Sequence, residues 1–361
     1  MTTFPPAAVE LLLSWYSQNA RDLPWRHTKH PYAILVSEIM LQQTRAETVK
    51  PYFARFMQAL PTLRHLAEAD EVTLTKLWEG LGYYSRVRNL QKAARAVMDE
   101  HDGQIPADFE ALLALPGVGR YTAGAVASIA FDLAVPAVDG NVLRVAARVM
   151  GDDGDVLLDA TRKRIEACLA PVVPMRDAGD FNQSLIELGA TVCLPRGEAR
   201  CDVCPLQLVC TAKREGRVGE LPVRVPKVKR RAEKLTVFVL CVTEPAGEPA
   251  YIIRRRPDGG LLGGLYEFPS VEGHLSPAEA MDYLAQNGVT VHSITPLPPA
   301  KHIFTHIDWQ MEGYLCAVAP VSHHEAVLGG FCVTAREIRE VYTLPSAFGA
   351  YKKIVTNGEG G

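Results

Sequence analysis

The sequence predicts two domains, an all-α domain followed by a smaller α+β domain. Apolar residues recur at three- and four-residue spacing from residue 6 to about 212, which is the period of amphipathic helices. After residue 234 the apolar period changes to two, which is typical of β-strands. The chain has 361 residues, and that length allows two domains that each bury a core.

Composition limits the class of protein. The net charge of −3 argues against a uniformly basic surface, although a local basic patch remains compatible with nucleic acid. No apolar run is long enough to span a bilayer, and the start of the chain lacks a basic segment followed by an apolar core. We therefore expect a cytosolic protein without a membrane partner.

Amphipathic spacing predicts roughly ten helices in the first domain, separated by Pro- and Gly-containing loops. The spacing is clear over residues 9–15, 34–41, 74–78, 90–97 and 185–188. The turn Leu115-Pro116-Gly117-Val118-Gly119 cannot continue a helix, and a helix is expected over Tyr121–Ile129. Such a turn can present free amides and a helix N-terminus to a phosphate, or it can be an ordinary helical corner.

The second half of the chain begins with a compositional change. Residues 213–234 contain nine basic residues, three acidic ones and two prolines, which predicts a linker. This linker is either a solvated tether or an arm that follows a phosphate backbone. Beyond it we expect strands over 235–242 and 251–256, a helix over 277–287 and a strand near 310–318.

Four of the eight cysteines are crowded together. Cys193, Cys201, Cys204 and Cys210 are separated by seven, two and five residues. In a reducing compartment this crowding favours a metal centre over disulfides. Four thiolates suit either a [4Fe–4S] cluster or a tetrahedral zinc ion, and the spacing does not decide between them.

Two carboxylates are candidates for acid–base chemistry. Glu38 lies between apolar residues of an expected helix, where burial would raise its pKa and let it donate a proton near neutral pH. Asp139 precedes an apolar stretch and is also a candidate helix N-cap. As a pair, two carboxylates can protonate a leaving group and stabilise an oxocarbenium-like cation, as in glycosidic cleavage.

Several ordered motifs resemble the adenine DNA glycosylase (MutY) family, within the helix–hairpin–helix superfamily of base-excision glycosylases. The resemblance covers about residues 10–212. The motifs are LPWR (23–26), SEIMLQQT (37–44), GLGYYSR (80–86), LPGVGRYTAGA (115–125), VDGN (138–141) and FNQSLIELGA (181–190). It implies a helix–hairpin–helix at about 113–130 within an all-α catalytic domain, residues 1–212.

The resemblance also assigns catalytic roles. Glu38 matches the general acid that protonates adenine, and Asp139 matches the carboxylate that stabilises the deoxyribose C1′. Asn141 and Tyr121 would orient the acid–base network and the water. Tyr121 stands where related endonuclease III-type enzymes carry a lysine nucleophile. Because it has no amine, a monofunctional glycosylase that leaves an abasic site is expected.

By the same resemblance, further residues would contact DNA. Trp25 and Arg26 would line the pocket for the flipped adenine, and Gln43 and Tyr83 would fill the vacated stack. The hairpin residues Gly117, Val118 and Gly119 would anchor the strand.

The family's cluster is [4Fe–4S], with cysteine gaps of six, two and five, whereas the first gap here has one extra residue. The resemblance assigns the four cysteines, within a loop at 193–210, as its ligands. Pro195 and Gly197 lie in this loop, so a turn can absorb the extra residue. Arg196 and Arg200 remain available for phosphate.

Residues 235–361 resemble, more loosely, the MutT-like (Nudix) module of this family. LLGGLYEFP (261–269) matches its glycine-rich strand region, but SPAEAMDYLAQNG lacks the metal-binding carboxylate array. We therefore expect no pyrophosphatase activity. KHIFTHIDW (301–309) matches the loop that meets 8-oxoguanine, which makes Phe304, Thr305 and His306 lesion contacts. The family commonly has serine where Thr305 stands.

The expected function is excision of adenine paired with 8-oxoguanine or guanine in duplex DNA, by a monomer associated with a bacterial-type nucleoid. One alternative is a glycosylase of the same superfamily for thymine or oxidised pyrimidines. Another is a non-catalytic iron–sulfur DNA-binding protein. The presence of both Glu38 and Asp139 in their motifs argues against the second alternative.

Overall fold

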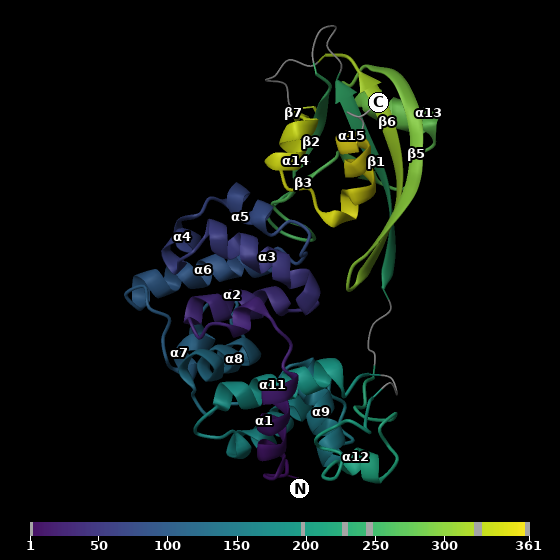
Figure 1. The fold of residues 1–361 in the computed structure, drawn as a ribbon. Helices are drawn as coiled ribbons and strands as arrows, with labels where there is room; N and C mark the ends of the chain where they lie inside the picture. Colours follow the sequence, from purple (N-terminus) through teal and green to yellow (C-terminus); the bar gives the residue numbers. More distant parts are fainter. Residues whose placement is uncertain (1–2, 196–198, 226–229, 243–247, 321–326, 358–361) are drawn as a thin grey trace. The chain divides into compact units, whose positions relative to one another are not determined.

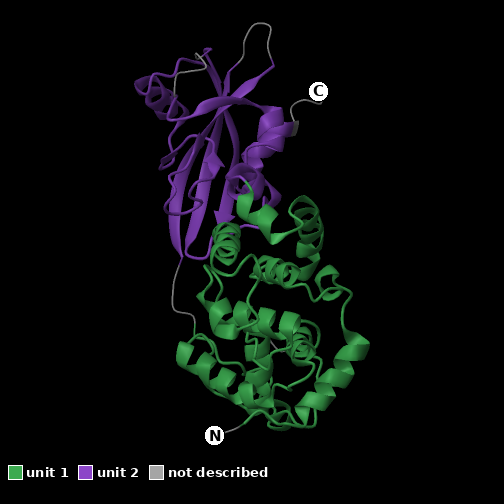
Figure 2. Cartoon of the chain, turned by 90° about the vertical axis from the view of Figure 1, so that its left-hand side faces the viewer, with its two compact units in different colours: residues 1–69, 85–226 green, residues 70–84, 227–361 purple. Residues whose placement is uncertain are grey.

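The computed structural model describes residues 3–195, 199–225, 230–242, 248–320 and 327–357. The chain forms two compact units, with residues 1–69 and 85–226 in unit 1 and residues 70–84 and 227–361 in unit 2 (Figure 2). The units therefore divide the chain at residue 226, within the expected linker. Residues 70–84 belong to unit 2, although the residues on both sides of them belong to unit 1. Arg196 and Gly197 lie outside the described residues.

Unit 1 is helical, as the apolar spacing predicts (Figure 1). Its helices are α1 (Ala8–Asn19), η1 (Pro24–Arg26), α2 (Pro31–Leu41), α3 (Ala46–Ala59), α4 (Leu63–Glu68), α6 (Ser85–Glu100), α7 (Phe109–Ala114), α8 (Arg120–Phe131), α9 (Gly140–Met150), α10 (Asp159–Leu169), η2 (Ala170–Val172), α11 (Ala178–Thr191) and α12 (Thr211–Arg214).

The helix after the glycine-containing turn packs in the centre of unit 1. This helix, α8, lies against α2, α7 and α11. Gly124 allows one close approach, because a Cβ there would lie 2.3 Å from the carbonyl oxygen of Pro136. In the turn itself Gly117 has φ +75°, a conformation that side chains other than glycine rarely adopt. Gly117 therefore permits the turn, and Gly124 permits the close packing of α8 against the backbone of Pro136.

Residues 215–225, which we call the strap, are packed onto unit 1. Leu221 is buried, and its carbonyl accepts a 2.8 Å hydrogen bond from Nε of Arg148. The carbonyl of Val223 accepts from the amide of Val156 at 3.1 Å. Much of the stretch expected as a linker is thus part of the helical unit, because buried backbone and apolar groups hold it there.

Unit 2 is built on a mixed sheet. The strands are β1 (Arg231–Val242), β2 (Ala250–Arg255), β3 (Tyr266–Glu267), β4 (Ser270–Glu272), β5 (Val291–Ile303), β6 (Ile307–Val318) and β7 (Phe331–Thr334). The order along the sheet is β3-β2-β1-β6-β5, with β4 paired to β1 and β7 paired to β2. The helices are α5 (Glu71–Leu77), α13 (Pro277–Gln286), α14 (Ala335–Glu340), η3 (Ser346–Phe348) and α15 (Gly349–Asn357).

Alternating residues of β1 enter two separate cores. Val237 and Val239 pack in one core with residues of α14 and α15, whereas Phe238 and Leu240 pack in the other with α13. This two-residue period is the one that predicts a strand here. β5 was not predicted, because its three prolines, at 296, 298 and 299, interrupt the pattern. It is an edge strand, where proline is tolerated.

Among the described residues, no helix is both long enough and apolar enough to cross a bilayer.

Candidate active site

A cleft of about 1220 Å³ lies in unit 1. Its lining comes from η1, α2, the hairpin, the start of α9 and α11. Most of the catalytic and pocket residues expected from the sequence lie around it: Trp25, Arg26, Glu38, Gln43, Gly117, Gly119, Tyr121, Asp139 and Asn141. Val118 does not line the cleft, because its side chain is buried in the hairpin.

Glu38 lies on α2, a largely apolar helix. Every residue from Tyr32 to Met40 is buried, and Glu38 itself is only 5% exposed. The hydroxyl of Tyr121 donates a 2.6 Å hydrogen bond to Oε2 of Glu38. The pKa of Glu38 is raised to about 7: burial raises it most, the hydrogen bond from Tyr121 and the charge of Arg26 lower it, and the charge of Asp139 raises it. Glu38 can therefore carry a proton near neutral pH.

Asp139 is the N-cap of α9. Its Oδ1 accepts from the amides of Asn141 and Val142, both at 2.8 Å, and its Oδ2 accepts from Nδ2 of Asn141 at 2.8 Å. Burial raises the pKa of Asp139, and these hydrogen bonds oppose that rise by stabilising the ionised form. The two interpretations of Asp139, helix cap and cleft carboxylate, are thus compatible.

Asn141 connects this carboxylate to the protein interior. Its Oδ1 accepts a 2.9 Å hydrogen bond from Nη2 of Arg144. Arg144 is buried and also donates to the carbonyls of Gly189 and Cys193, each at 2.7 Å. Sequence reasoning missed Arg144, since its partners lie 45 and 49 residues away and no local pattern marks them.

Arg26 is held by a carboxylate that sequence reasoning also missed. Glu187 on α11 is fully buried and binds Nη2 of Arg26 at 2.8 Å and Nε of Arg21 at 2.6 Å. Burial alone would raise the pKa of Glu187, but the two arginines outweigh burial and lower it. Trp25 is buried beside Arg26, with its ring edge-on to Phe53 at 5.6 Å. The only sequence signal for Glu187 is its place in the FNQSLIELGA motif.

The end of α2 is fixed by a residue from another motif. Arg86 is buried, and its Nη1 donates to the carbonyls of Ile39, Met40 and Gln42 at 2.9, 2.9 and 2.6 Å. Gln43 follows with φ +58° and an exposed side chain. The arginine of GLGYYSR therefore positions the loop that presents Gln43 to the cleft.

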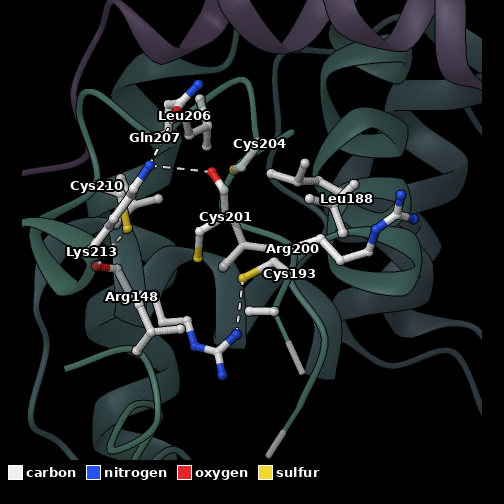
Figure 3. A pocket seen from close by; sticks show the side chains of 15 residues that line it. Arg148, Leu188, Cys193, Arg200, Cys201, Cys204, Leu206, Gln207, Cys210 and Lys213 are labelled. Atoms are coloured by element: carbon white, nitrogen blue, oxygen red, sulfur yellow. Dashed lines mark hydrogen bonds between the residues drawn. The ribbon is translucent and has the colours of Figure 1, made fainter. Parts of the chain in front are cut away.

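The four clustered cysteines line one small cavity (Figure 3). Nη1 of Arg148 lies 3.2 Å from Sγ of Cys193, and Arg200 and Lys213 also line the cavity. Burial raises the pKa of the Cys204 thiol to about 12, so an isolated thiolate is disfavoured there. Among the described residues, no three His, Cys, Asp or Glu side chains are arranged around a single metal ion.

The residues expected to meet the opposite base lie in unit 2. Thr305 and His306 are exposed in the turn between β5 and β6, and Phe304 packs edge-on against Trp309 at 4.9 Å. Tyr83 has φ +49°, is half exposed, and its hydroxyl lies 3.1 Å from Oγ1 of Thr305. The structure thus brings Tyr83 and Thr305 together within one unit.

A helical unit with a hairpin, a cleft and two cleft carboxylates of raised pKa is the architecture of a helix–hairpin–helix DNA glycosylase. Residues 36–173 match the model described as "HhH-GPD superfamily base excision DNA repair protein", and residues 238–353 match "NUDIX domain". An adenine DNA glycosylase of Rattus norvegicus is 39% identical over 85% of this chain and 70% of its own length. One from Buchnera aphidicola is 30% identical over 82% and 83%.

The chain belongs to the adenine DNA glycosylase family. A solved structure titled as a thermostable thymine-DNA glycosylase is 30% identical, with a TM-score of 0.53, and the match covers 58% of this chain and 96% of that one. The predicted fold class, a helix–hairpin–helix glycosylase domain followed by a Nudix-like α+β domain, is confirmed. The protein is a DNA N-glycosylase, a hydrolase of base-excision repair.

Proposed function

We propose that this enzyme hydrolyses the N-glycosidic bond of adenine paired with 8-oxoguanine or guanine in duplex DNA, and leaves an uncut abasic site. The observation that carries the proposal is the buried Glu38, with a pKa of about 7 and a hydrogen bond to Tyr121. The choice of adenine as the excised base rests on the names of the relatives, and the proposed reaction rests on the residues that line the cleft.

The protonated carboxyl of Glu38 donates its proton to a ring nitrogen of adenine as the bond between C1′ and N9 breaks. Adenine then leaves as a neutral base, and positive charge develops on the deoxyribose. The ionised carboxylate of Asp139 stabilises that charge. Water supplies the hydroxyl at C1′, and the proton it releases restores Glu38. Asn141 and Arg144 hold Asp139 in place.

The proposal of base removal without strand cleavage rests on the cleft lining. A lyase step needs an amine that forms a Schiff base with C1′. Tyr121 occupies the hairpin position beside Glu38, and the described residues that line the cleft include no lysine.

We propose that Cys193, Cys201, Cys204 and Cys210 hold a [4Fe–4S] cluster. A single zinc ion would draw four sulfurs to about 2.3 Å from one point. The four thiols line one shared cavity, which could accommodate either group, and membership of the adenine DNA glycosylase family favours the [4Fe–4S] cluster. The guanidinium of Arg148, 3.2 Å from Sγ of Cys193, suits the charge of a thiolate there. Such a cluster would serve to fix the 193–210 loop, and it takes no part in the proton transfers.

For the C-terminal module we propose recognition of the base opposite adenine, by Tyr83, Phe304, Thr305 and His306. We propose no pyrophosphatase activity there. On α13, Glu279 forms a capping box with Ser276, so its carboxylate is already engaged in capping the helix.

Single-turnover reactions test the function. Duplexes with adenine opposite 8-oxoguanine, guanine or thymine, and with thymine opposite guanine, are incubated with excess enzyme. Adenine release should be fastest opposite 8-oxoguanine, with strand breaks only after alkali. Glu38→Gln should lower the rate of adenine release by a factor of at least about 10², the loss expected when a general acid is removed. Binding of the lesion-containing duplex should persist in this variant. Release of thymine instead of adenine would overturn the proposal.

Metal analysis tests the cluster. Protein purified without exposure to oxygen should contain about four iron atoms and four acid-labile sulfides per chain, as its stoichiometry requires. Cys204→Ser should lower both contents together. One zinc ion per chain without sulfide would contradict the assignment.

A further inference from the structure

The strap carries an arginine whose charge is not neutralised within the protein. Arg224 is exposed and lines the catalytic cleft, and its guanidinium has no hydrogen-bond or ion-pair partner in the described parts of the chain. A Cβ built on Gly140 would lie 3.9 Å from Nη2 of Arg224. Arg224 is therefore adjacent to the residue that follows Asp139.

A second arginine is held on the same wall through Val156. Val156 is 1% exposed; its amide donates to the carbonyl of Val223 at 3.1 Å, and its carbonyl accepts from Nε of Arg162 at 3.0 Å. The backbone of one buried residue thus fixes both the chain next to Arg224 and the side chain of Arg162. Arg162 is exposed, lines the cleft, and forms no ion pair with a described carboxylate.

Several other arginines nearby are already paired, although Arg45 at the start of α3 also lines the cleft without an ion pair to a described carboxylate. Arg21 and Arg26 share the buried Glu187, and Arg217 of the strap binds Asp153 and Glu220. Arg164, two residues after Arg162 on α10, binds Asp152 through two hydrogen bonds. An exposed, unpaired cation at a cleft wall is available to bind an anion from outside the protein, and the backbone of DNA supplies one at each nucleotide.

We propose that Arg224 and Arg162 form a phosphate-binding pair for the DNA strand that contains the excised adenine. This inference rests on the proposed function, because it uses Asp139 to place the deoxyribose. The phosphate of the nucleotide at Asp139 lies next to that sugar and hence on the wall where Arg224 stands. The strap is then part of the DNA-binding surface of the catalytic unit. A phosphate contact of this kind adds affinity for every sequence and gives no base specificity.

Salt dependence of binding tests the pair. The full-length Glu38→Gln protein and its derivatives are titrated with a duplex bearing adenine opposite 8-oxoguanine at 50 to 200 mM NaCl. Adding Arg224→Gln should reduce the magnitude of the slope of log K against log [NaCl] by about 0.9, the value for one phosphate. Between 50 and 200 mM NaCl, the factor by which its affinity falls should then be about three to four times smaller than the factor for the parent. Arg162→Gln combined with Arg224→Gln should reduce the slope by about twice as much.

Arg164→Gln is the matched control, since that arginine is paired with Asp152 and does not line the cleft. It should keep the parent slope, and Arg224→Lys should keep it because the charge remains. A slope for Arg224→Gln equal to that of Arg164→Gln would overturn the inference. The proposed function fails separately, if the wild-type protein releases no adenine in the excision assay.

Discussion

The acidity of Glu38 is the residue-scale property on which the proposed chemistry depends. Burial raises its pKa, the hydrogen bond from Tyr121 lowers it, and the charge of Asp139 raises it. The hydroxyl of Tyr121 donates to the carboxylate and so stabilises the ionised form. Tyr121 thus keeps the pKa of Glu38 close to neutrality, where the group can both give and regain a proton.

Replacing Tyr121 should therefore move the pH dependence of excision. In the wild type the single-turnover rate should fall as pH rises through about 7, since Glu38 then loses its proton. In Tyr121→Phe the falling limb should move to higher pH, by about one unit for the loss of one hydrogen bond to the charged form. Rates between pH 5.5 and 9 measure the shift.

The control for this experiment is Tyr32→Phe. Tyr32 is on the same helix, but its hydroxyl donates to the carbonyl of Leu60 at 2.7 Å. Its pH profile should match that of the wild type. An unmoved limb in Tyr121→Phe would show that another group controls the rate.

The raised pKa of Glu38 also predicts how folding stability depends on pH. The folded state keeps a proton up to about pH 7, whereas the unfolded chain releases it near 4.5. Stability contributed by this proton is complete below pH 4.5 and is lost as pH rises through 7. Between pH 4 and 8 the wild type should lose about 3 kcal/mol relative to Glu38→Gln. Urea unfolding at each pH measures this difference, and parallel curves for the two proteins would contradict it.

The close packing of α8 against the backbone of Pro136 depends on Gly124. A Cβ there would lie 2.3 Å from the carbonyl oxygen of Pro136, far inside normal contact. Gly124→Ala should therefore destabilise the protein by about 1–3 kcal/mol, the usual cost of overpacking. In a helix interior alanine is more favourable than glycine by about 1 kcal/mol. A net loss of folding stability in Gly124→Ala would therefore be due to the steric clash with Pro136. Denaturant unfolding measures the change.

Gly119, the N-cap of the same helix, provides the matched comparison. A Cβ at this position would meet no atom within 4 Å, and its φ of −92° suits any residue. Gly119→Ala should cost no more than about 1 kcal/mol, the usual range for an N-cap change from glycine. If both variants were equally stable, α8 would not depend on the close approach to Pro136.

Elements with a strong local period could be predicted from the sequence, and long-range partnerships could not. The helix expected over residues 121–129 is observed as Arg120–Phe131, and the strand expected over 235–242 as Arg231–Val242. β5 has no such period because prolines interrupt it. The partnerships Arg26–Glu187 and Tyr121–Glu38 join residues 161 and 83 positions apart, and only packing reveals them.

At the scale of the whole molecule, unit 2 contains a segment from the first half of the chain. Lys352 on α15 binds Glu79 at 2.5 Å, and Arg255 on β2 binds Glu71 at 3.3 Å. Together with the contact between Tyr83 and Thr305, these pairs join residues 70–84 to the strand-containing module. Under the proposed function, the module would therefore act on base recognition in two ways, through its own loop and through the segment that carries Tyr83.

Removal of the module should accordingly reduce discrimination more than it reduces excision. Deleting residues 231–361 keeps the cleft and the strap but removes Thr305 and both ion-pair partners of residues 70–84. The ratio of single-turnover rates for adenine opposite 8-oxoguanine and opposite guanine should fall by about tenfold or more, equivalent to one or two lost hydrogen bonds. Thr305→Ala removes one hydroxyl and keeps the ion pairs, so its ratio should fall less. An unchanged ratio in the deletion would mean that unit 1 alone distinguishes the two bases.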